Sequence, residues 1–189
     1  MQQTQPISLV ILVHQEAGSI EAGSMNLLFI PYMLGENSPI YDPYAKAGFI
    51  GLTYKHTRSH MVRSILEGTA YHIRWIIETI EEVCCKIQDL KVIGGGANSR
   101  IWPEIIANVT GKTLSVVENP LEAGALGSLM VALVGLNFES GFGIAKRIAK
   151  EEKKFSGASY PISDKYDHLY ELFRMHYSRA RDIYHEMST

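Results

Sequence analysis

Residues 92–111 read VIGGGANSRIWPEIIANVTG, and this stretch decides the fold of the chain. A short apolar segment that ends at Ile93 runs into three consecutive glycines, Gly94, Gly95 and Gly96. Glycine adopts backbone angles that other residues avoid, and it lets another group approach the main chain without meeting a side chain. The stretch therefore predicts a strand over 90–93, a tight glycine turn, and an amphipathic helix over about 100–110.

A glycine turn that leads into a helix supports two interpretations. The first N–H groups of a helix are unpaired and the helix dipole is positive there, so this position favours a phosphate. The sequence is neither a Walker loop nor GxGxxG, because no Gly-Lys-Ser/Thr follows the glycines. From the residues alone, the turn is either part of a nucleotide site or only a compact strand-to-helix connection.

The overall composition describes an ordinary globular protein. The chain has 189 residues, 46% of them hydrophobic and 20% charged, which is enough for one domain or slightly more. Its net charge of −2 gives no basic excess that would indicate nucleic acid or an anionic membrane as a partner. No apolar run is long enough to cross a bilayer, so we expect no membrane partner.

The two cysteines, Cys84 and Cys85, are adjacent in a helical pattern. Neighbouring helix positions point in different directions, so a disulfide between them is not expected. Their spacing also matches no zinc site. We interpret them as packing residues of a reduced, cytoplasmic protein.

The first part of the chain has little regular pattern. Residues 7–13 are apolar but lack the basic start of a signal peptide, so we expect a strand or a disordered leader. Residues 15–26 indicate a connector, 27–33 a short strand interrupted by Pro31, and 35–47 a long loop with two prolines.

The rest of the chain alternates between strands and helices, which argues for an α/β fold. A long helix is expected from about Thr57, with Thr57 or Ser59 as its N-cap. Its apolar stripe comprises Val62, Ile65, Leu66, Thr69, Ile73, Ile76, Ile77, Ile80, Val83, Cys84 and Ile87. A strand over 114–117, a helix over 121–135 and a charged, solvated helix and loop around 146–154 follow.

A last helix is expected from about Ser163. Its predicted apolar stripe comprises Tyr166, Leu169, Tyr170, Phe173, His176, Tyr177 and Ile183. The helix over 121–135 is unusual because small residues fill its first turns, namely Ala123, Gly124, Ala125, Gly127 and Ser128. Either tight packing against a sheet or the close approach of another backbone or a ligand would explain them.

Several separated blocks resemble the C-terminal domain of the FGGY carbohydrate kinases, and its xylulokinase-like branch in particular. The blocks are LLFIPYMLGENSPIYDP (27–43), the family's second signature over 47–67, GGGANSRIW (94–102) and NPLEAGALGSLMVALVG (119–135). The signature positions are Ala47, Phe49, Gly51, Leu52, His60, Met61, Ser64, Ile65, Leu66 and Glu67. The resemblance begins at about Gly23, so we divide the chain into a leader or remnant (1–22) and the kinase domain (23–189).

The resemblance implies an actin-like, RNase H-like α/β fold that forms one half of a two-domain sugar kinase. ATP, with Mg²⁺, would bind between the halves and donate its γ-phosphoryl group to a sugar hydroxyl. By the family pattern, Gly95 and Gly96 would lie against the nucleotide and Ser99 would contact adenine, with Ala97 and Asn98 nearby. Some relatives carry a longer amide side chain at the position of Ser99, so its reach is shorter here.

The resemblance also implies that a large part of the kinase is missing from this chain. Family members are well over twice as long, and their N-terminal domain supplies the catalytic aspartate and most of the sugar pocket. We therefore expect no catalytic residue here and little or no kinase activity from this chain alone. D-xylulose is the first candidate sugar, with gluconate, L-ribulose and other polyols as alternatives. A second hypothesis is a binding or assembly module without chemistry, for example a homodimer.

Other polar residues have simpler explanations. Asp42 fits an Asp-Pro turn residue that bonds its own backbone. Glu36 fits an exposed loop carboxylate, and the alternative is that it faces the cleft between the two kinase domains. Glu67 lies in an apolar stripe, where a carboxylate needs a structural partner. His56 and His60 are four residues apart but have no third ligand, so no metal site is expected. Asn37 replaces an arginine that xylulokinase-like relatives often carry.

Overall fold

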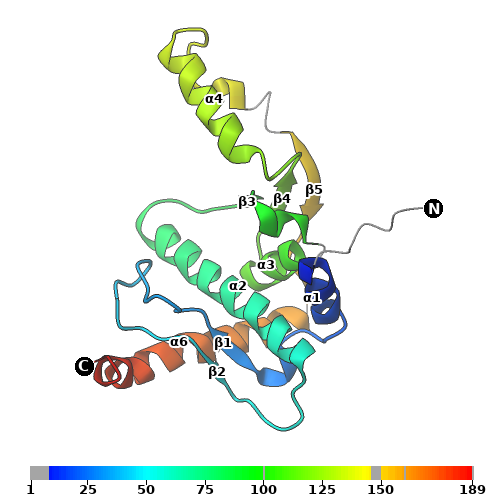
Figure 1. The fold of residues 1–189 in the computed structure, drawn as a ribbon, viewed down its shortest axis with the longest axis vertical. Helices are drawn as coiled ribbons and strands as arrows, with labels where there is room; N and C mark the ends of the chain where they lie inside the picture. Colours follow the sequence, from blue (N-terminus) through cyan, green and yellow to red (C-terminus); the bar gives the residue numbers. More distant parts are fainter. Residues whose placement is uncertain (1–8, 100, 146–149, 160, 189) are drawn as a thin grey trace, which may run out of the picture.

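The structure is a computed structural model, and it describes residues 9–99, 101–145, 150–159 and 161–188. A helical body lies at one end of the molecule, helix α4 stands at the other end, and a small sheet joins them (Figure 1). The helices are α1 (Leu9–Gly18), α2 (Arg58–Val83), α3 (Trp102–Thr110), α4 (Ala123–Gly135) and α6 (Ile162–Glu186). The strands are β1 (Leu28–Ile30), β2 (Gly48–Ile50), β3 (Asp89–Val92), β4 (Thr113–Val117) and β5 (Glu151–Phe155), and the short 3₁₀ turns are η1 (Ser24–Asn26), η2 (Gly95–Asn98) and η3 (Phe142–Ile144).

Helix α2 is the central element of the body, and it begins at the predicted cap. Thr57 is its N-cap, and the Thr57 N–H donates to Nδ1 of His60 at 3.2 Å. Gly68 allows the helix to cross β1 closely, because a Cβ there would overlap the carbonyl of Phe29. The predicted stripe is wrong at four positions, since Ile65, Ile80, Val83 and Cys84 are exposed. The buried face instead includes Arg63, Glu67 and Tyr71.

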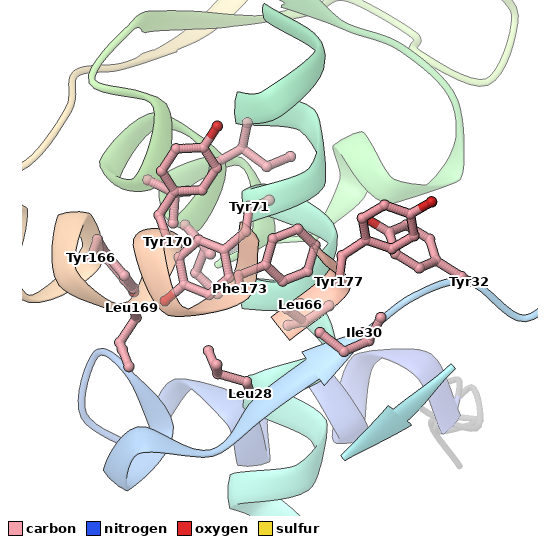
Figure 2. Close-up of a cluster of buried hydrophobic side chains, with 14 of the residues drawn as sticks. Leu28, Ile30, Tyr32, Leu66, Tyr71, Tyr166, Leu169, Tyr170, Phe173 and Tyr177 are labelled. Atoms are coloured by element: carbon pink, nitrogen blue, oxygen red, sulfur yellow. The ribbon is translucent and has the colours of Figure 1, made fainter. Parts of the chain in front are cut away.

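An aromatic cluster forms the core between α2, α6 and the end of β1 (Figure 2). Helix α6 contributes the predicted residues Tyr166, Leu169, Tyr170, Phe173 and Tyr177, all of which are buried. The prediction fails near the end of α6, where Ile183 is 59% exposed and the neighbouring Tyr184 is buried. In a helix with 3.6 residues per turn, positions seven residues apart do not point in the same direction. Over a long helix the buried position therefore moves to a neighbouring residue.

The α/β prediction is confirmed by the second sheet, whose strand order is β3-β4-β5. Strands β3 and β4 are parallel, with Leu90 opposite Leu114, and α3 connects them. Strand β5 pairs antiparallel with β4, with Leu114 opposite Phe155. The expectation of a charged helix and loop is wrong for 151–154, which belong to β5, while 146–149 lie outside the described residues. Charged side chains are common on edge strands as well as on solvated helices and loops. The charge pattern alone therefore did not distinguish a strand from a helix or loop.

The start of the chain also differs from the prediction. Residues 9–13 belong to helix α1 rather than to a strand or a disordered leader, and residues 7 and 8 lie outside the described part. Helix α1 packs on α2, and Ala17 is completely buried. Short apolar runs fit helix or strand equally well, so periodicity could not separate them. The proposed division at Gly23 stays a prediction.

Two further predictions concern the loops. The loop over 35–47 is found, but it leads into strand β2, which the sequence did not indicate and which pairs antiparallel with β1. Cys84 and Cys85 are free thiols and both are exposed, so their interpretation as packing residues is wrong. Helix α2 ends at Val83, before the pair. Within the described residues, no helix is long and apolar enough to span a membrane.

Helix α4 projects away from the body (Figure 1). None of its residues is buried, and a Cβ added at Gly124 or Gly127 would meet nothing within 4 Å. Tight packing against the sheet therefore does not explain its small residues in this chain. The alternative that remains is a neighbour outside the described residues.

Candidate nucleotide site

The glycine turn follows β3 directly, at the carboxyl end of a parallel pair of strands. The parallel neighbour β4 ends at Val117, and the connection after it leads to α4. The N–H of Gly94 donates to the carbonyl of Pro120 at 2.8 Å, which joins the two connections. In open α/β sheets, ligands bind outside the carboxyl ends of the strands. The turn and the 118–122 connection thus form a candidate binding edge.

The three glycine positions of the turn differ in whether the structure requires glycine there. Gly94 has a φ of +82°, a conformation that disfavours any side chain. A Cβ at Gly96 would lie 2.7 Å from Cε3 of Trp102, so packing against this ring requires glycine there. Gly95 is exposed, and the nearest atom to an added Cβ is Cδ2 of Leu121 at 4.0 Å. Gly95 therefore leaves open backbone at the surface without an internal structural need for glycine.

The other residues of the predicted site have different surroundings. Ala97 is buried in the core. Asn98 is exposed beside it. Ser99 is 8% exposed, and its Oγ accepts the N–H of Trp102 at 3.1 Å and that of Ile101 at 3.4 Å. A hydroxyl that accepts these bonds can still donate one. The nucleotide contacts assigned to Gly95, Gly96, Ala97 and Ser99 stay predictions.

The glycine turn leaves a small exposed surface at Gly95 but brings together no set of metal ligands among the described residues. At Gly95 the nearest atom to an added Cβ is Cδ2 of Leu121 at 4.0 Å, so no side chain crowds this exposed position. Among the described residues, no group of three or more His, Cys, Asp or Glu side chains is close enough to hold a metal. If Mg²⁺ bound here, it would need ligands from the phosphates of a nucleotide or from another part of a larger protein.

Asp42 serves a structural role in the loop over 35–47. One carboxylate oxygen accepts the N–H of Tyr44 at 3.0 Å, which confirms the expected turn bond, and Nε2 of His185 lies 3.1 Å from the same oxygen. The other oxygen accepts the Tyr177 hydroxyl at 2.8 Å. Burial alone would raise the pKa of Asp42, but these hydrogen bonds hold it below its usual value. Burial and this carboxylate raise the pKa of Tyr177 to about 12, so its hydroxyl stays protonated.

Glu67 also has the structural role that its position predicts. It accepts the N–H of Gly23 at 2.9 Å and the Ser24 hydroxyl at 2.7 Å. It also pairs with Nε of Arg63 at 2.7 Å and accepts the Tyr166 hydroxyl at 3.0 Å. The Arg63 guanidinium continues to the carbonyl of Ile20 at 3.2 Å. This network connects the segment before β1 to α2 and α6, away from the glycine turn.

Glu36 is more enclosed than an exposed loop carboxylate, so that prediction is wrong. Its side chain is 18% exposed, and Oε2 lies 3.3 Å from Nε2 of His72. Burial lowers the pKa of His72, although Glu36 acts in the opposite direction. His56 and His60 each accept a backbone N–H from a nearby threonine, Thr53 and Thr57 respectively. These imidazoles thus shape the loop before α2.

Comparison with known proteins gives the class of protein to which this geometry belongs. Residues 11–136 match the sequence model of the FGGY family of carbohydrate kinases, C-terminal domain. The chain belongs to this family.

Particular relatives are similar over most of this chain but only over part of their own length. Xylulose kinase from Bacillus subtilis (strain 168) is 29% identical over 89% of this chain and 34% of that protein. Gluconokinase from the same organism is 31% identical over 62% of this chain and 23% of that protein. The crystal structure of xylulose kinase from Rhodospirillum rubrum superposes with a TM-score of 0.78 at 28% identity, over 92% of this chain and 34% of that one. The chain thus spans about a third or less of these relatives and shares their fold.

Sequence reasoning missed two parts of the candidate site. Pro120 fixes the turn through its carbonyl, and Trp102 packs under Gly96. The sequence shows a tryptophan at position 102, near the start of the expected helix. It does not show that the Trp102 ring packs against Gly96, because this contact depends on how α3 is placed against the sheet. No sequence signal specified the bond between Gly94 and Pro120, because it joins two separate connections.

Proposed function

We propose that this chain is the nucleotide-binding part of an ATP-dependent carbohydrate kinase. The observation that carries the proposal is the open backbone at Gly95, placed at the carboxyl edge of parallel strands in a domain of this family. ATP with Mg²⁺ would supply the phosphoryl group and neutralise its charge. In this chain, the turn would bind and orient the adenosine side, and Ser99 would donate a hydrogen bond while its oxygen caps the start of α3.

We propose D-xylulose as the sugar, because xylulose kinases recur among the similar proteins. Gluconate is the main alternative, since a gluconokinase is similar to a comparable degree. The residues that choose the sugar and the base that activates its hydroxyl would belong to the portion that the relatives have and this chain lacks. This chain alone is therefore expected to phosphorylate neither sugar. We also propose a cytoplasmic location, because free exposed thiols persist in a reducing compartment.

Calorimetric titration of the chain with ATP and ADP, with and without Mg²⁺, tests the nucleotide site. We expect saturable binding that Gly95→Val weakens, because its side chain would cover the open backbone. Gly141→Val is the matched control, since Gly141 has an extended backbone and nothing within 4 Å of an added Cβ. Equal binding by the two variants would contradict a site at Gly95, and absence of binding by the unmodified chain would contradict an autonomous half-site.

The assembly-module hypothesis rests on a separate observation, the unburied helix α4. Its apolar residues include Leu129, which is 48% exposed, and Val131, which is 61% exposed. Exposed apolar surface of this kind favours association, and a homodimer is the simplest form. Light scattering over a wide concentration range tests it. A strict monomer would exclude the homodimer, and a dimer that binds no nucleotide would favour the module over the kinase.

A further inference from the structure

The two cysteines of the chain meet where helix α2 ends. The helix stops at Val83, and Cys84 has φ −130° and ψ −83°, which lies outside the helical region. Because the backbone leaves the helix at Cys84, the side chains of Cys84 and Cys85 are no longer directed apart as they would be within a helix. The Cys84 thiol donates to Sγ of Cys85 at 3.6 Å. The two sulfur atoms therefore lie side by side.

The pair is accessible, and the backbone on both sides of it is anchored. Both cysteines are exposed. The N–H of Cys84 donates to the carbonyl of Ile80 at 2.9 Å, and the N–H of Ile87 donates to Oε1 of Glu81 at 2.9 Å. These two bonds hold the chain before and after the pair. The fold thus presents two neighbouring thiols to solvent at a defined separation.

The separation of the sulfurs favours a bridging atom over a direct S–S bond. Cα atoms joined by a trans peptide are about 3.8 Å apart, whereas the cysteines of a disulfide usually have their Cα atoms about 4.4–6.8 Å apart. A tetrahedral centre with bonds of about 2.3 Å to sulfur holds two sulfurs roughly 3.8 Å apart. The observed 3.6 Å between the Cys84 and Cys85 sulfurs is close to this second geometry. A centre bonded to both sulfurs therefore needs less rearrangement than a disulfide.

Two thiols define the kind of centre that this pair can hold. Thiolates are soft ligands that select soft, thiophilic centres. In the described ranges, no third His, Cys, Asp or Glu joins them, whereas structural zinc takes four protein ligands. A trivalent arsenical with one organic substituent needs only two more bonds. The two cysteines therefore complete its coordination without help from another residue.

We propose that Cys84 and Cys85 form a dithiol site that binds a trivalent organic arsenical through both sulfurs. In the reaction with an arsenoxide, two As–S bonds form, the bonds from arsenic to oxygen break, and the two thiol protons leave with the oxygen as water. Arsenic stays trivalent, so no oxidant or reductant is needed. The dithiol site precedes β3, whereas the glycine turn follows this strand, so the inference is independent of the nucleotide site.

Phenylarsine oxide is the probe for this site. The 189-residue chain is reduced with a phosphine, incubated with the probe and measured by intact-mass spectrometry, which is simple to interpret because the sequence has two cysteines. We expect one arsenic per chain with release of one water, and retention of the adduct in excess monothiol. The second As–S bond forms within one molecule, so Cys84→Ser and Cys85→Ser should each weaken retention by about 100-fold or more.

A matched variant separates the pair from the mere number of thiols. Cys84→Ser/Asp182→Cys keeps two thiols per chain but moves one of them to an exposed position on α6. We expect this variant to lose the adduct in excess monothiol, as the single variants do. Two arsenicals on each unmodified chain, or equal retention by a single variant or by the matched variant, would overturn the proposal.

Thermal unfolding tests whether the fold builds the site. Adjacent cysteines can also react in an unfolded chain, and a ligand raises the melting temperature only when it binds the folded state more tightly. We expect the arsenical to raise the melting temperature of the unmodified chain and to leave that of Cys85→Ser unchanged. No rise in the unmodified chain would show that the folded structure does not set the sulfur positions for a bridging centre, and it would overturn the proposal.

Discussion

The two ends of this molecule differ in how far the chain completes its own packing. Between α2 and α6, aromatic side chains fill the core, and the carboxylates of Glu67 and Asp42 have several hydrogen-bond partners each. Around β3 and α4, the part of the chain that the structure describes leaves β3 at a sheet edge, provides no acceptor for the Trp102 N–H, and buries no residue of α4. The difference indicates that most of the buried contacts of the described residues lie at the helical end.

Loss of the Glu67 carboxylate should have the largest effect on stability. Glu67→Ala would leave Arg63 buried without its anionic partner, which typically costs about 3–5 kcal/mol. Glu82→Ala is the control, because Glu82 is exposed on the same helix. Urea unfolding followed by circular dichroism measures both. A loss below about 1 kcal/mol for Glu67→Ala would show that the network is not the main anchor of this end.

Truncation of leucines should distinguish the two ends directly. Leu169 on α6 is 1% exposed, and Leu169→Ala is expected to cost about 2–5 kcal/mol through lost burial and a cavity. Leu129 on α4 is 48% exposed, and Leu129→Ala is expected to change the free energy of unfolding by only about 0.5 kcal/mol. Similar losses in thermal or urea unfolding would remove the contrast between the ends.

The glycine turn should separate packing from binding. Gly96→Ala is expected to destabilise the chain by about 1–3 kcal/mol, because its Cβ would overlap the Trp102 ring. Gly95→Ala is expected to remain within about 0.5 kcal/mol of the unmodified chain, because its Cβ has room. Urea unfolding gives both values. The reverse order would mean that Gly95, rather than Gly96, carries the structural constraint.

Asp42 should give the helical end an acid-dependent stability. Its folded pKa is lowered by the hydrogen bonds from Tyr177, the Tyr44 N–H and His185, which outweigh burial. The contribution is therefore complete above the unfolded pKa of about 3.9 and is lost as the pH falls through the lower folded pKa. Asp42→Asn should cost about 1–3 kcal/mol at neutral pH and flatten the decline in acid, as measured by urea unfolding between pH 2 and 6. Asp182→Asn, at an exposed site, serves as the control.

Substitution of Tyr71 should give the smallest change in the free energy of unfolding. This tyrosine lies in the otherwise well-bonded core between α2 and α6. Its buried hydroxyl has no hydrogen-bond partner among the described residues, so Tyr71→Phe should be neutral or stabilise by up to about 1 kcal/mol. Tyr166→Phe should destabilise by about 1–2 kcal/mol, since the Tyr166 hydroxyl bonds both Arg63 and Glu67. Thermal unfolding compares the pair. An equal loss in both variants would indicate that the Tyr71 hydroxyl has a partner after all.

The strong local patterns predicted much of the fold. The 3.6-residue stripes located α2 and α6, and the sequence around the glycines placed β3, the turn, α3 and β4. Prediction failed where a short segment depends on its neighbour. Strand β2 has three residues and exists through its pairing with β1, and β5 was hidden by its charges. Helix α1 was missed because a short apolar run fits two conformations until its packing partner is known.

The sequence by itself determined the family, the α/β order of the elements and the position of the glycine turn, because these depend on residues close together in the chain. Only the tertiary structure showed which positions of the turn require glycine, how the Pro120 carbonyl bonds the turn, and which carboxylates have buried partners. It alone also showed that, within the described ranges, β3 lies at a sheet edge and the Trp102 N–H has no partner. These features depend on which distant segments meet. Hydrogen bonding and packing between such segments follow from the geometry of the whole fold, which no local pattern contains.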